Sequence, residues 1–361
     1  MKTQTIKFLL MATVLLSAGL LASCSKDDPA IPVVKTELNA GITAASLVIS
    51  TTSEGVGTGN FLKGSQAPLI AAIASAQAVS NDATATQLIV TNATVALAAA
   101  VATYNTQIVV PIDPTNLIGQ WTFDQLTSAA VGVVVKDYSG NSRDGAIKAG
   151  HAFWGAGIPT LAADRYGVAG KALHFDKGSN VEIPYNTALN PTTMSISLWA
   201  KADVNTPSVI NNQYMVSMNR WNGYKLQFQD SPKAFFTVKA NVTGVVDPAY
   251  YDRDNASPLV TQGQWWHIVV TFGGGHMVFY LNGVAVKDWD NTPGTAISQS
   301  AAPINLVFGQ DLPSGGYSTV DGSVNYVNWG GFYIGAMDEV RMYKSVLTAS
   351  QVTSIYTVEK P

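Results

Sequence analysis

The chain has 361 residues, which is long for one typical domain and enough for two, and only 12% of them are charged, which argues against a disordered or coiled-coil protein. The net charge of −3 leaves no basic footprint for nucleic acid, so we expect no nucleic-acid partner. The single cysteine, Cys24, excludes an intramolecular disulfide and a cysteine-rich zinc site.

The first 23 residues have the pattern of a signal peptide. Lys2 and Lys7 precede an apolar run over residues 8–22, which is shorter than the roughly 20 residues of a membrane-spanning helix. The run leads into Leu-Ala-Ser-Cys at 21–24, which resembles a bacterial lipobox whose lipid-modified residue is Cys24. An ordinary secretory peptide with a chance cysteine is the alternative.

Residues 25–28, Ser-Lys-Asp-Asp, resemble the short acidic tag of surface-exported Gram-negative lipoproteins. The alternative is that these residues are only a hydrophilic spacer. Pro29 and Pro32 oppose helix, so residues 24–34 are expected to be an extended tether. The resemblance implies an outer-membrane lipoprotein that faces the cell exterior and contacts the membrane through its lipid anchor only.

Residues 35–107 are predicted to form a small alanine-rich helical domain. Leu38, Ile42, Ala45 and Ile49 recur at helical spacing, and two further helical patterns follow. The stretches at 52–61 and 85–97 resemble FIVAR-like helical modules of cell-surface proteins, which implies a spacer or weak binding unit. We favour a spacer, because this segment contains no histidine and few acidic residues.

After a proline-containing linker at 108–114, the hydrophobic period changes to two. Residues 195–200 and 267–272 alternate as strands do, and Asn282-Gly283 is a strong hairpin signal. Many strands separated by turns, without a long helical stretch, predict a mainly β protein over 115–361: an antiparallel β-sandwich preceded by the helical domain.

Six motifs of this second part appear in the order found in LamG-like jelly rolls of the concanavalin A-like lectin/glucanase fold, which they resemble. They lie at 117–124, 137–141, 170–176, 264–272, 280–283 and 335–343, and a short closing helix is expected from about residue 345. The resemblance implies a jelly-roll domain that binds a glycan or a protein.

We expect no catalytic residues. Glucanases on this fold carry a Glu-x-Asp-x-(x)-Glu strand, which is absent here. Asp338 and Glu339 are adjacent, so regular strand alternation would point them to opposite faces of a sheet. No G-x-S-x-G elbow occurs, and His174 and His267 are interpreted as structural sheet residues.

A Ca²⁺ ion is the one cofactor that the resemblance suggests, because relatives of this fold often place calcium near the sheet rim. Carboxylate and amide oxygens suit this ion, and turn hydrogen bonds of Asp and Asn are the alternative. The matching residues are Asp124, Asp137, Asn141 and Asp338.

Three stretches read as long, aromatic-rich loops, at 219–224, 247–254 and 325–331. Loops on a rigid sandwich commonly carry function, although aromatic residues there can also cap the core. The candidate ligand-binding residues are Trp221, Tyr250, Tyr251, Asp252, Arg253, Tyr326 and Trp329.

The sequence therefore predicts a lipid-anchored protein with a non-catalytic glycan-binding jelly roll, its partner a polysaccharide or glycoprotein. The alternatives are a cell-envelope adhesin that binds an envelope or host protein and, less favoured, a glycoside hydrolase-like enzyme. Fold alone does not decide among them.

Overall fold

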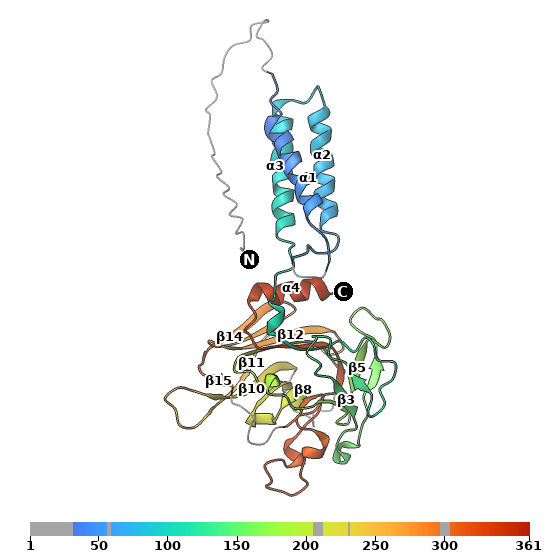
Figure 1. The fold of residues 1–361 in the computed structure, drawn as a ribbon, viewed down its shortest axis with the longest axis vertical. Helices are drawn as coiled ribbons and strands as arrows, with labels where there is room; N and C mark the ends of the chain where they lie inside the picture. The colour runs from blue at the N-terminus through green and yellow to red at the C-terminus, as the bar shows by residue number, and fades with distance from the viewer. Residues whose placement is uncertain (1–31, 56–58, 205–211, 230–231, 297–303) are drawn as a thin grey trace.

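The computed structural model describes residues 32–55, 59–204, 212–229, 232–296 and 304–361 (Figure 1). The predicted signal peptide, Cys24 and most of the tether lie outside these residues. The described chain forms a helical bundle at one end and a β-sandwich at the other, with one helix between them (Figure 1).

The bundle consists of three helices, and each helix runs antiparallel to the one before it in the chain (Figure 1). One apolar stripe of each helix is buried, which includes Leu38, Leu69 and Leu97, and Phe61 stacks on Tyr104 with ring centroids 4.2 Å apart. The helices are α1 (Thr36–Thr51), α2 (Gln66–Asn81) and α3 (Gln87–Asn105).

Helices α2 and α3 begin with different caps. Thr86 caps α3 and accepts a hydrogen bond from the backbone N–H of Ile89. At α2, the Glu54 carboxylate from the preceding loop accepts the backbone N–H groups of Gly64 and Gln66. A tertiary contact therefore satisfies the free donors that open this helix.

The first sheet of the sandwich is antiparallel and lies next to the bundle (Figure 1). Its strands in spatial order are β14 (Val284–Thr292), β13 (Gly275–Leu281), β12 (Trp266–Gly273), β7 (Met194–Ala202), β17 (Gly335–Tyr343), β5 (Ala172–Phe175) and β4 (Thr160–Ala162), with β1 (Leu117–Trp121) also paired to β17.

The second sheet is also antiparallel and lies on the side away from the bundle. Its strands in spatial order are β11 (Ala249–Asp254), β10 (Lys233–Asn241), β9 (Tyr224–Gln229), β8 (Asn212–Met218), β16 (Leu306–Phe308), β6 (Asn180–Ile183), β3 (Gly145–Lys148) and β2 (Val134–Val135), with β15 (Thr295–Ala296) paired to β10. The predicted mainly β class, an antiparallel sandwich behind a small helical domain, is confirmed.

The core fills the space between the two sheets, where alternate residues of each strand point inward. Leu198 of β7, Phe279 of β13 and Phe236 of β10 are fully buried there. The predicted hairpin between β13 and β14 is present, and both Asn282 and Gly283 have positive φ, as a two-residue turn of this kind requires.

Helix α4 (Ala349–Glu359) covers the outer face of the first sheet, at the place where the closing helix is expected. It begins with a capping box in which Thr348 and Gln351 satisfy each other's backbone N–H groups. A Cβ on Gly283 would lie 2.9 Å from Tyr356 of α4, so glycine lets the hairpin turn approach the helix. Strand β7 is consequently buried on both faces.

The linker between the modules is held on both sides. Toward the bundle, the backbone N–H of Val109 donates to the carbonyl of Asn60, 2.8 Å away. Toward α4, the Val110 N–H donates to Ser354 Oγ (2.9 Å), and the Gln351 side chain donates to the Pro111 carbonyl (2.7 Å). These bonds connect the bundle to the sandwich through α4.

The bundle core supplies a stability prediction with a control on the same helix. Leu97 is 3% exposed in α3, whereas Leu88 is 70% exposed. We expect Leu97→Ala to lower the free energy of unfolding by about 3 kcal/mol, because it leaves a cavity, and Leu88→Ala to change it by less than about 0.5 kcal/mol. Chemical denaturation followed by helical circular dichroism measures both, and equal losses would contradict the assigned core.

Candidate functional site

The end of the sandwich farthest from the bundle gathers three of the aromatic residues that the sequence singles out. Trp221 lies on the short helix η4 (Arg220–Asn222), and Trp329 ends the short helix η6 (Val327–Trp329). Their ring centroids are 6.3 Å apart, and Tyr326 meets Trp329 edge-to-face at 5.8 Å. Trp329 is 45% exposed, so two separate loops place indole surface at one position.

A buried ion pair supports these loops from below. Arg220 donates from Nε to the Asp311 carboxylate, and both side chains are essentially inaccessible to solvent. Asp311 also accepts from the Tyr317 hydroxyl and from the backbone N–H of Gly331. Burial raises the pKa of Asp311, and the positive charge of Arg220 opposes that rise. The pair joins η4 to the loops that follow β16.

The backbone at η4 is strained, which indicates that its side chains are held in place by the surrounding structure. Asn219 and Arg220 both have positive φ, at 64° and 51°, although neither is glycine. Such conformations persist where tertiary contacts over-determine them, and they occur often at functional sites. Here the contacts are the Asp311 ion pair and the Arg220 hydrogen bond to the Tyr326 carbonyl.

Sequence reasoning missed the other half of this aromatic cluster. Trp154, in the short helix η2 (Ala152–Trp154), meets Tyr317 at 4.8 Å and Phe332 at 5.5 Å between ring centroids. The Arg220 guanidinium lies over the Tyr317 ring at 5.3 Å and so links the two halves. The available signal was the aromatic content of irregular segments at 151–154 and 314–317.

The predicted loop at 247–254 is in fact the edge strand β11, whose side chains alternate between two faces. Tyr250 and Asp252 point outward: Tyr250 lies beside Lys239, and the Thr237 hydroxyl donates to Asp252. Tyr251 lies in the core, against Phe272 and with its hydroxyl bonded to the Pro293 carbonyl.

Tyr251 is therefore a core residue and not part of an exposed binding loop, because the alternation of side chains along β11 turns it inward. Arg253 shares its face, packing on Tyr251 and Trp289. Of the candidates in this segment, Tyr250 and Asp252 remain on the outer face of the second sheet.

Of the four residues suggested for Ca²⁺, Asp137 and Asn141 use their side chains to bind the backbone, and Asp124 lies near enough to Asp338 to raise its pKa. The Asp137 carboxylate accepts backbone N–H groups of Gln120, Ser139 and Arg143, and the Asn141 amide donates to the Leu117 and Ile118 carbonyls. Within the described residues, no group of three or more His, Cys, Asp or Glu side chains is placed to hold a metal ion. The alternative reading, turn formation, accounts for Asp137 and Asn141.

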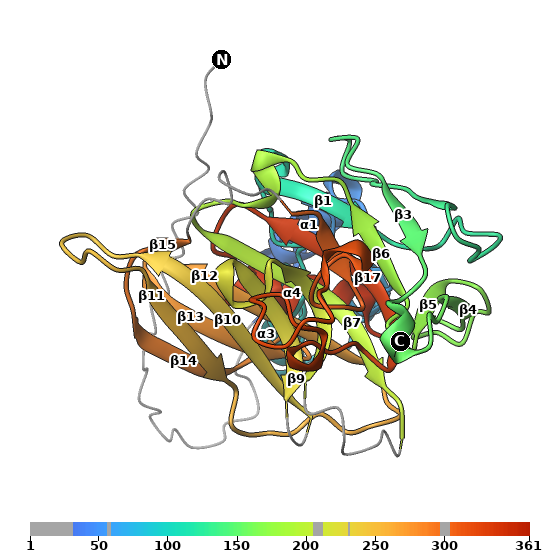
Figure 2. The same cartoon turned by 90° about the horizontal axis from the view of Figure 1, so that it is seen from below.

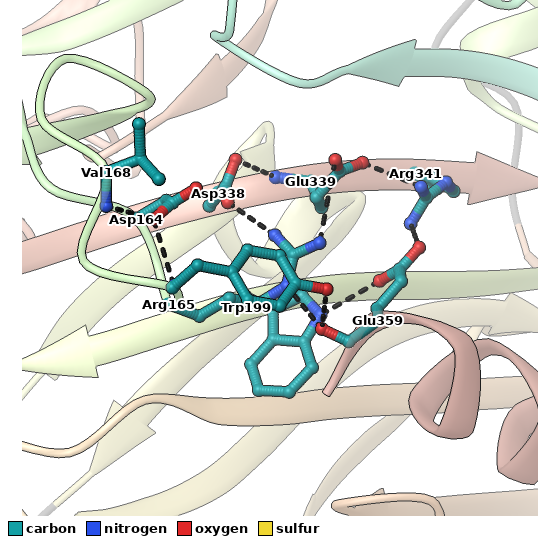
Figure 3. A network of polar contacts seen from close by, with 9 residues as sticks. Asp164, Arg165, Val168, Trp199, Asp338, Glu339, Arg341 and Glu359 are labelled. Atoms are coloured by element: carbon teal, nitrogen blue, oxygen red, sulfur yellow. Dashed lines mark hydrogen bonds and ion pairs between the residues drawn. The ribbon is translucent and has the colours of Figure 1, made fainter. Parts of the chain in front are cut away.

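The fourth residue, Asp338, belongs to a buried charge cluster beneath the end of α4 (Figure 3). Its carboxylate lies 2.7 Å from Arg165 Nη1, and Arg165 Nη2 lies 3.9 Å from Glu339. Arg341 joins Glu339 to Glu359, at 2.6 Å from each. Trp199 and Tyr166 complete the cluster by donating to the Glu359 side chain and backbone carbonyl.

The expectation that Asp338 and Glu339 face opposite sides of the sheet is wrong. Both carboxylates contact Arg165, because the register of β17 shifts between Asp338 and Arg341 and Glu339 adopts a φ of 52°. Such a β-bulge interrupts the alternation of side chains. Adjacent acidic residues can therefore lie on one face.

This carboxyl pair is enclosed. A cleft of about 460 Å³ lies between the linker, the end of α4 and the sheet, and it is lined by Glu339, Arg341 and Glu359. The Asp338 side chain, however, is only 2% exposed and is bound to Arg165. Glu339 therefore borders the cleft, whereas Asp338 lies behind it in contact with Arg165.

The histidines of the strand motifs are partnered within the sheet. His267 Nε2 lies 2.9 Å from Ser197 Oγ, and the fully buried ring packs beside Trp199 and Tyr356, which also contact each other. Burial lowers the pKa of His267 to about 4, so the ring is neutral at physiological pH. His174 Nε2 lies 2.8 Å from Asp203.

One protein-family model matches part of the chain. Residues 175–353 match the Laminin_G_3 family model, described as the concanavalin A-like lectin/glucanases superfamily. The sequence has no match among characterised proteins.

Several solved structures are similar to the chain. Domain 4 of AbnA, a GH43 extracellular arabinanase from Geobacillus stearothermophilus, in complex with arabinotriose, has 20% identity and a TM-score of 0.44, covering 67% of this chain and 98% of that one. The binding domain of Paraclostridial Mosquitocidal Protein 1 has 17% identity and a TM-score of 0.47, covering 67% and 52%. The receptor binding domain of botulinum neurotoxin mosaic serotype C/D has 12% identity and a TM-score of 0.47, covering 68% and 52%. The chain thus spans about half of these toxin binding domains.

The charge cluster predicts a pH dependence of stability. Burial raises the pKa of Asp338 to about 8, the Glu339 carboxylate adds to the rise, and Arg165 opposes it. The folded state therefore keeps a proton that the unfolded chain releases near pH 4, and stability falls as pH rises from about 4 to about 8. Above about pH 6.5 the opposite trend from His267 is complete.

Urea denaturation between pH 6.5 and 9 measures this dependence. We expect the free energy of unfolding of the wild type to decrease over this range, and Asp338→Asn to reduce the slope while it retains the contact with Arg165. Tyr138→Phe, at an exposed position, is the control and should keep the slope. A flat wild-type profile together with a strongly destabilised Asp338→Asn variant would show that Asp338 is ionised instead.

Proposed function

We propose that this chain, whose residues 175–353 match the concanavalin A-like lectin/glucanase family, is a lipid-anchored, non-catalytic glycan-binding protein of the outer membrane that faces the cell exterior. The observation that carries the proposal is the pair of indoles, Trp221 and Trp329, on the outer side of the second sheet. Aromatic rings with one accessible face and a fixed orientation suit the apolar face of a sugar.

The placement of this aromatic pair supports the proposal. The bundle and the linker approach the sandwich at the first sheet, and the loops after β16 form the opposite end (Figure 1). Figure 2 views the molecule from that opposite end, with β9, β10 and β11 side by side. A chain tethered through its N-terminus would thus direct the aromatic loops away from its attachment.

The non-catalytic part of the proposal is supported by the enclosure of the carboxyl pair. Asp338 and Glu339 bind Arg165 and Arg341, and the end of α4 lies over them. Turnover of a glycan that is lost in Glu339→Gln but retained in Trp329→Ala would overturn it in favour of a hydrolase.

Glycan binding is tested with the full-length mature protein on an array of host, plant and microbial glycans, followed by calorimetry on the strongest ligand. We expect Trp329→Ala and Trp221→Ala each to weaken binding roughly fivefold to thirtyfold, because a central aromatic contact is worth on the order of 1–2 kcal/mol. Tyr138→Ala is the matched control, since Tyr138 is equally exposed (45%) but follows β2 and lies against β1.

The outcome also separates the glycan proposal from the adhesin alternative. Absence of any glycan ligand, together with capture of a purified envelope or host protein that persists after its deglycosylation, would contradict glycan binding. Loss of that capture on deglycosylation would support it.

The lipid anchor predicts a separate result. Cys24 follows the apolar run at the lipobox position, and more than one acyl chain gives stable membrane attachment. We expect metabolic labelling with an alkyne fatty acid to mark the wild type and Ser25→Ala, and to be lost in Cys24→Ala. Unchanged labelling of Cys24→Ala would remove the anchor from the proposal, and protease accessibility on intact cells would test exposure at the exterior.

A further inference from the structure

A buried lysine beneath the aromatic pair has no counter-ion in contact. Lys225 lies on β9 and is only 8% exposed. Its ammonium lies over the Tyr214 ring at 5.1 Å and over the Trp221 ring at 5.9 Å. Within the described residues, no carboxylate is within ion-pair distance of it, whereas Lys136 lies 2.7 Å from Asp144 and Lys233 lies 3.5 Å from Asp254.

The two carboxylates that act on Lys225 through space are both engaged elsewhere. Asp311 is bound by Arg220, Tyr317 and the Gly331 backbone. Asp252 is two strands away, because Lys225 is opposite Thr237 and Thr237 is opposite Asp252, and the Thr237 hydroxyl donates to that carboxylate. Two strand spacings are about 10 Å, and Lys225 leans the other way, toward Tyr214 on β8 and Trp221.

Arg220 adds a second cation beside the same indole. Its guanidinium lies 5.1 Å from the Trp221 ring, and its Nη1 is buried without a hydrogen-bond partner. Arg220 and Lys225 thus face Trp221 together, while Asp311 is the one carboxylate in contact with either of them among the described residues. A buried cation without a paired charge costs free energy, which a bound anion would recover.

We propose that the surface at Trp221 and Trp329 takes an acidic sugar, whose carboxylate or sulfate group pairs with Lys225 while its ring packs on the indoles. The inference rests on the proposed glycan-binding function and names the class of glycan. Burial lowers the pKa of Lys225, while Asp252 and Asp311 oppose this lowering from a distance and Arg220 adds to it, so an anion in contact would favour the charged ammonium. The ion pair with Asp311 holds Arg220 beside Trp221 and offsets its charge, so Lys225 is the cation that pairs with the ligand.

Paired ligands that differ in charge test the inference with the full-length mature protein. Oligogalacturonate is compared with its methyl ester, sialyllactose with lactose, and a sulfated heparin oligosaccharide with its desulfated form. We expect at least tenfold tighter binding of the acidic member of one or more pairs, and this preference should shrink as salt is raised. Which pair responds distinguishes a uronic acid, a sialic acid and a sulfated sugar.

Substitutions at Lys225 locate the effect. Lys225→Met keeps the length and apolar stem of the side chain and should lose the preference for the acidic ligand, whereas Lys225→Arg should retain most of it. Lys233→Met on the neighbouring strand is the control, because Lys233 already pairs with Asp254. Thermal unfolding should show Lys225→Met to be at least as stable as the wild type, since it removes an unpaired buried charge.

The outcomes are distinguishable from those of the proposed function. Neutral glycans that bind as well as acidic ones, and that depend on Trp329 but not on Lys225, would overturn the inference and leave glycan binding standing. Equal binding of poly-glutamate and of the acidic sugar would show an anion site without sugar recognition and would also overturn it. Binding of no glycan at all would remove both.

Discussion

The arrangement of the molecule depends on the need to bury both faces of the first sheet. Its inner face packs in the sandwich core, and strand β7 is buried on its outer face as well. Helix α4 supplies this second cover, and the linker binds to α4 through Ser354 and Gln351. Because the cover and the linker occupy the first sheet, the second sheet and the loops after β16 are left facing away from the bundle (Figure 1).

Buried charged side chains have different partners at the two ends of the sandwich. Beneath α4, two guanidiniums interleave with the carboxyl groups of Asp338, Glu339 and Glu359, and each carboxyl group has a guanidinium partner, with Asp338 protonated below about pH 8 (Figure 3). Such pairing offsets the cost of taking the charges out of water and ties the end of α4 to β17. At the aromatic end, Arg220 is paired with Asp311, whereas Lys225 lies over two aromatic rings and has no ion pair with any described residue.

The aromatic end also shows why the sequence alone does not indicate that Trp221 and Trp329 lie at one site. In the sequence, Trp221 and Trp329 are 108 positions apart, and each alone can be a core cap. Their meeting depends on the Arg220–Asp311 ion pair, which bridges η4 and the loop after β16. Arg220 also connects Trp154 and Tyr317 to this cluster. Its guanidinium lies over the Tyr317 ring, and Tyr317 contacts Trp154. No local pattern encodes these contacts.

The sequence alone determined the helical bundle, the strands and the Asn282-Gly283 hairpin, because hydrophobic periodicity and turn preferences depend on a few neighbouring residues. It likewise indicated the aromatic loops from which Trp221 and Trp329 come. Tertiary structure alone decided that Tyr251 lies in the core, that a bulge brings Asp338 and Glu339 to one guanidinium, and that Lys225 is buried beside Trp221. Those outcomes depend on strand register, on a backbone irregularity and on contacts between distant segments, which no short stretch of sequence contains.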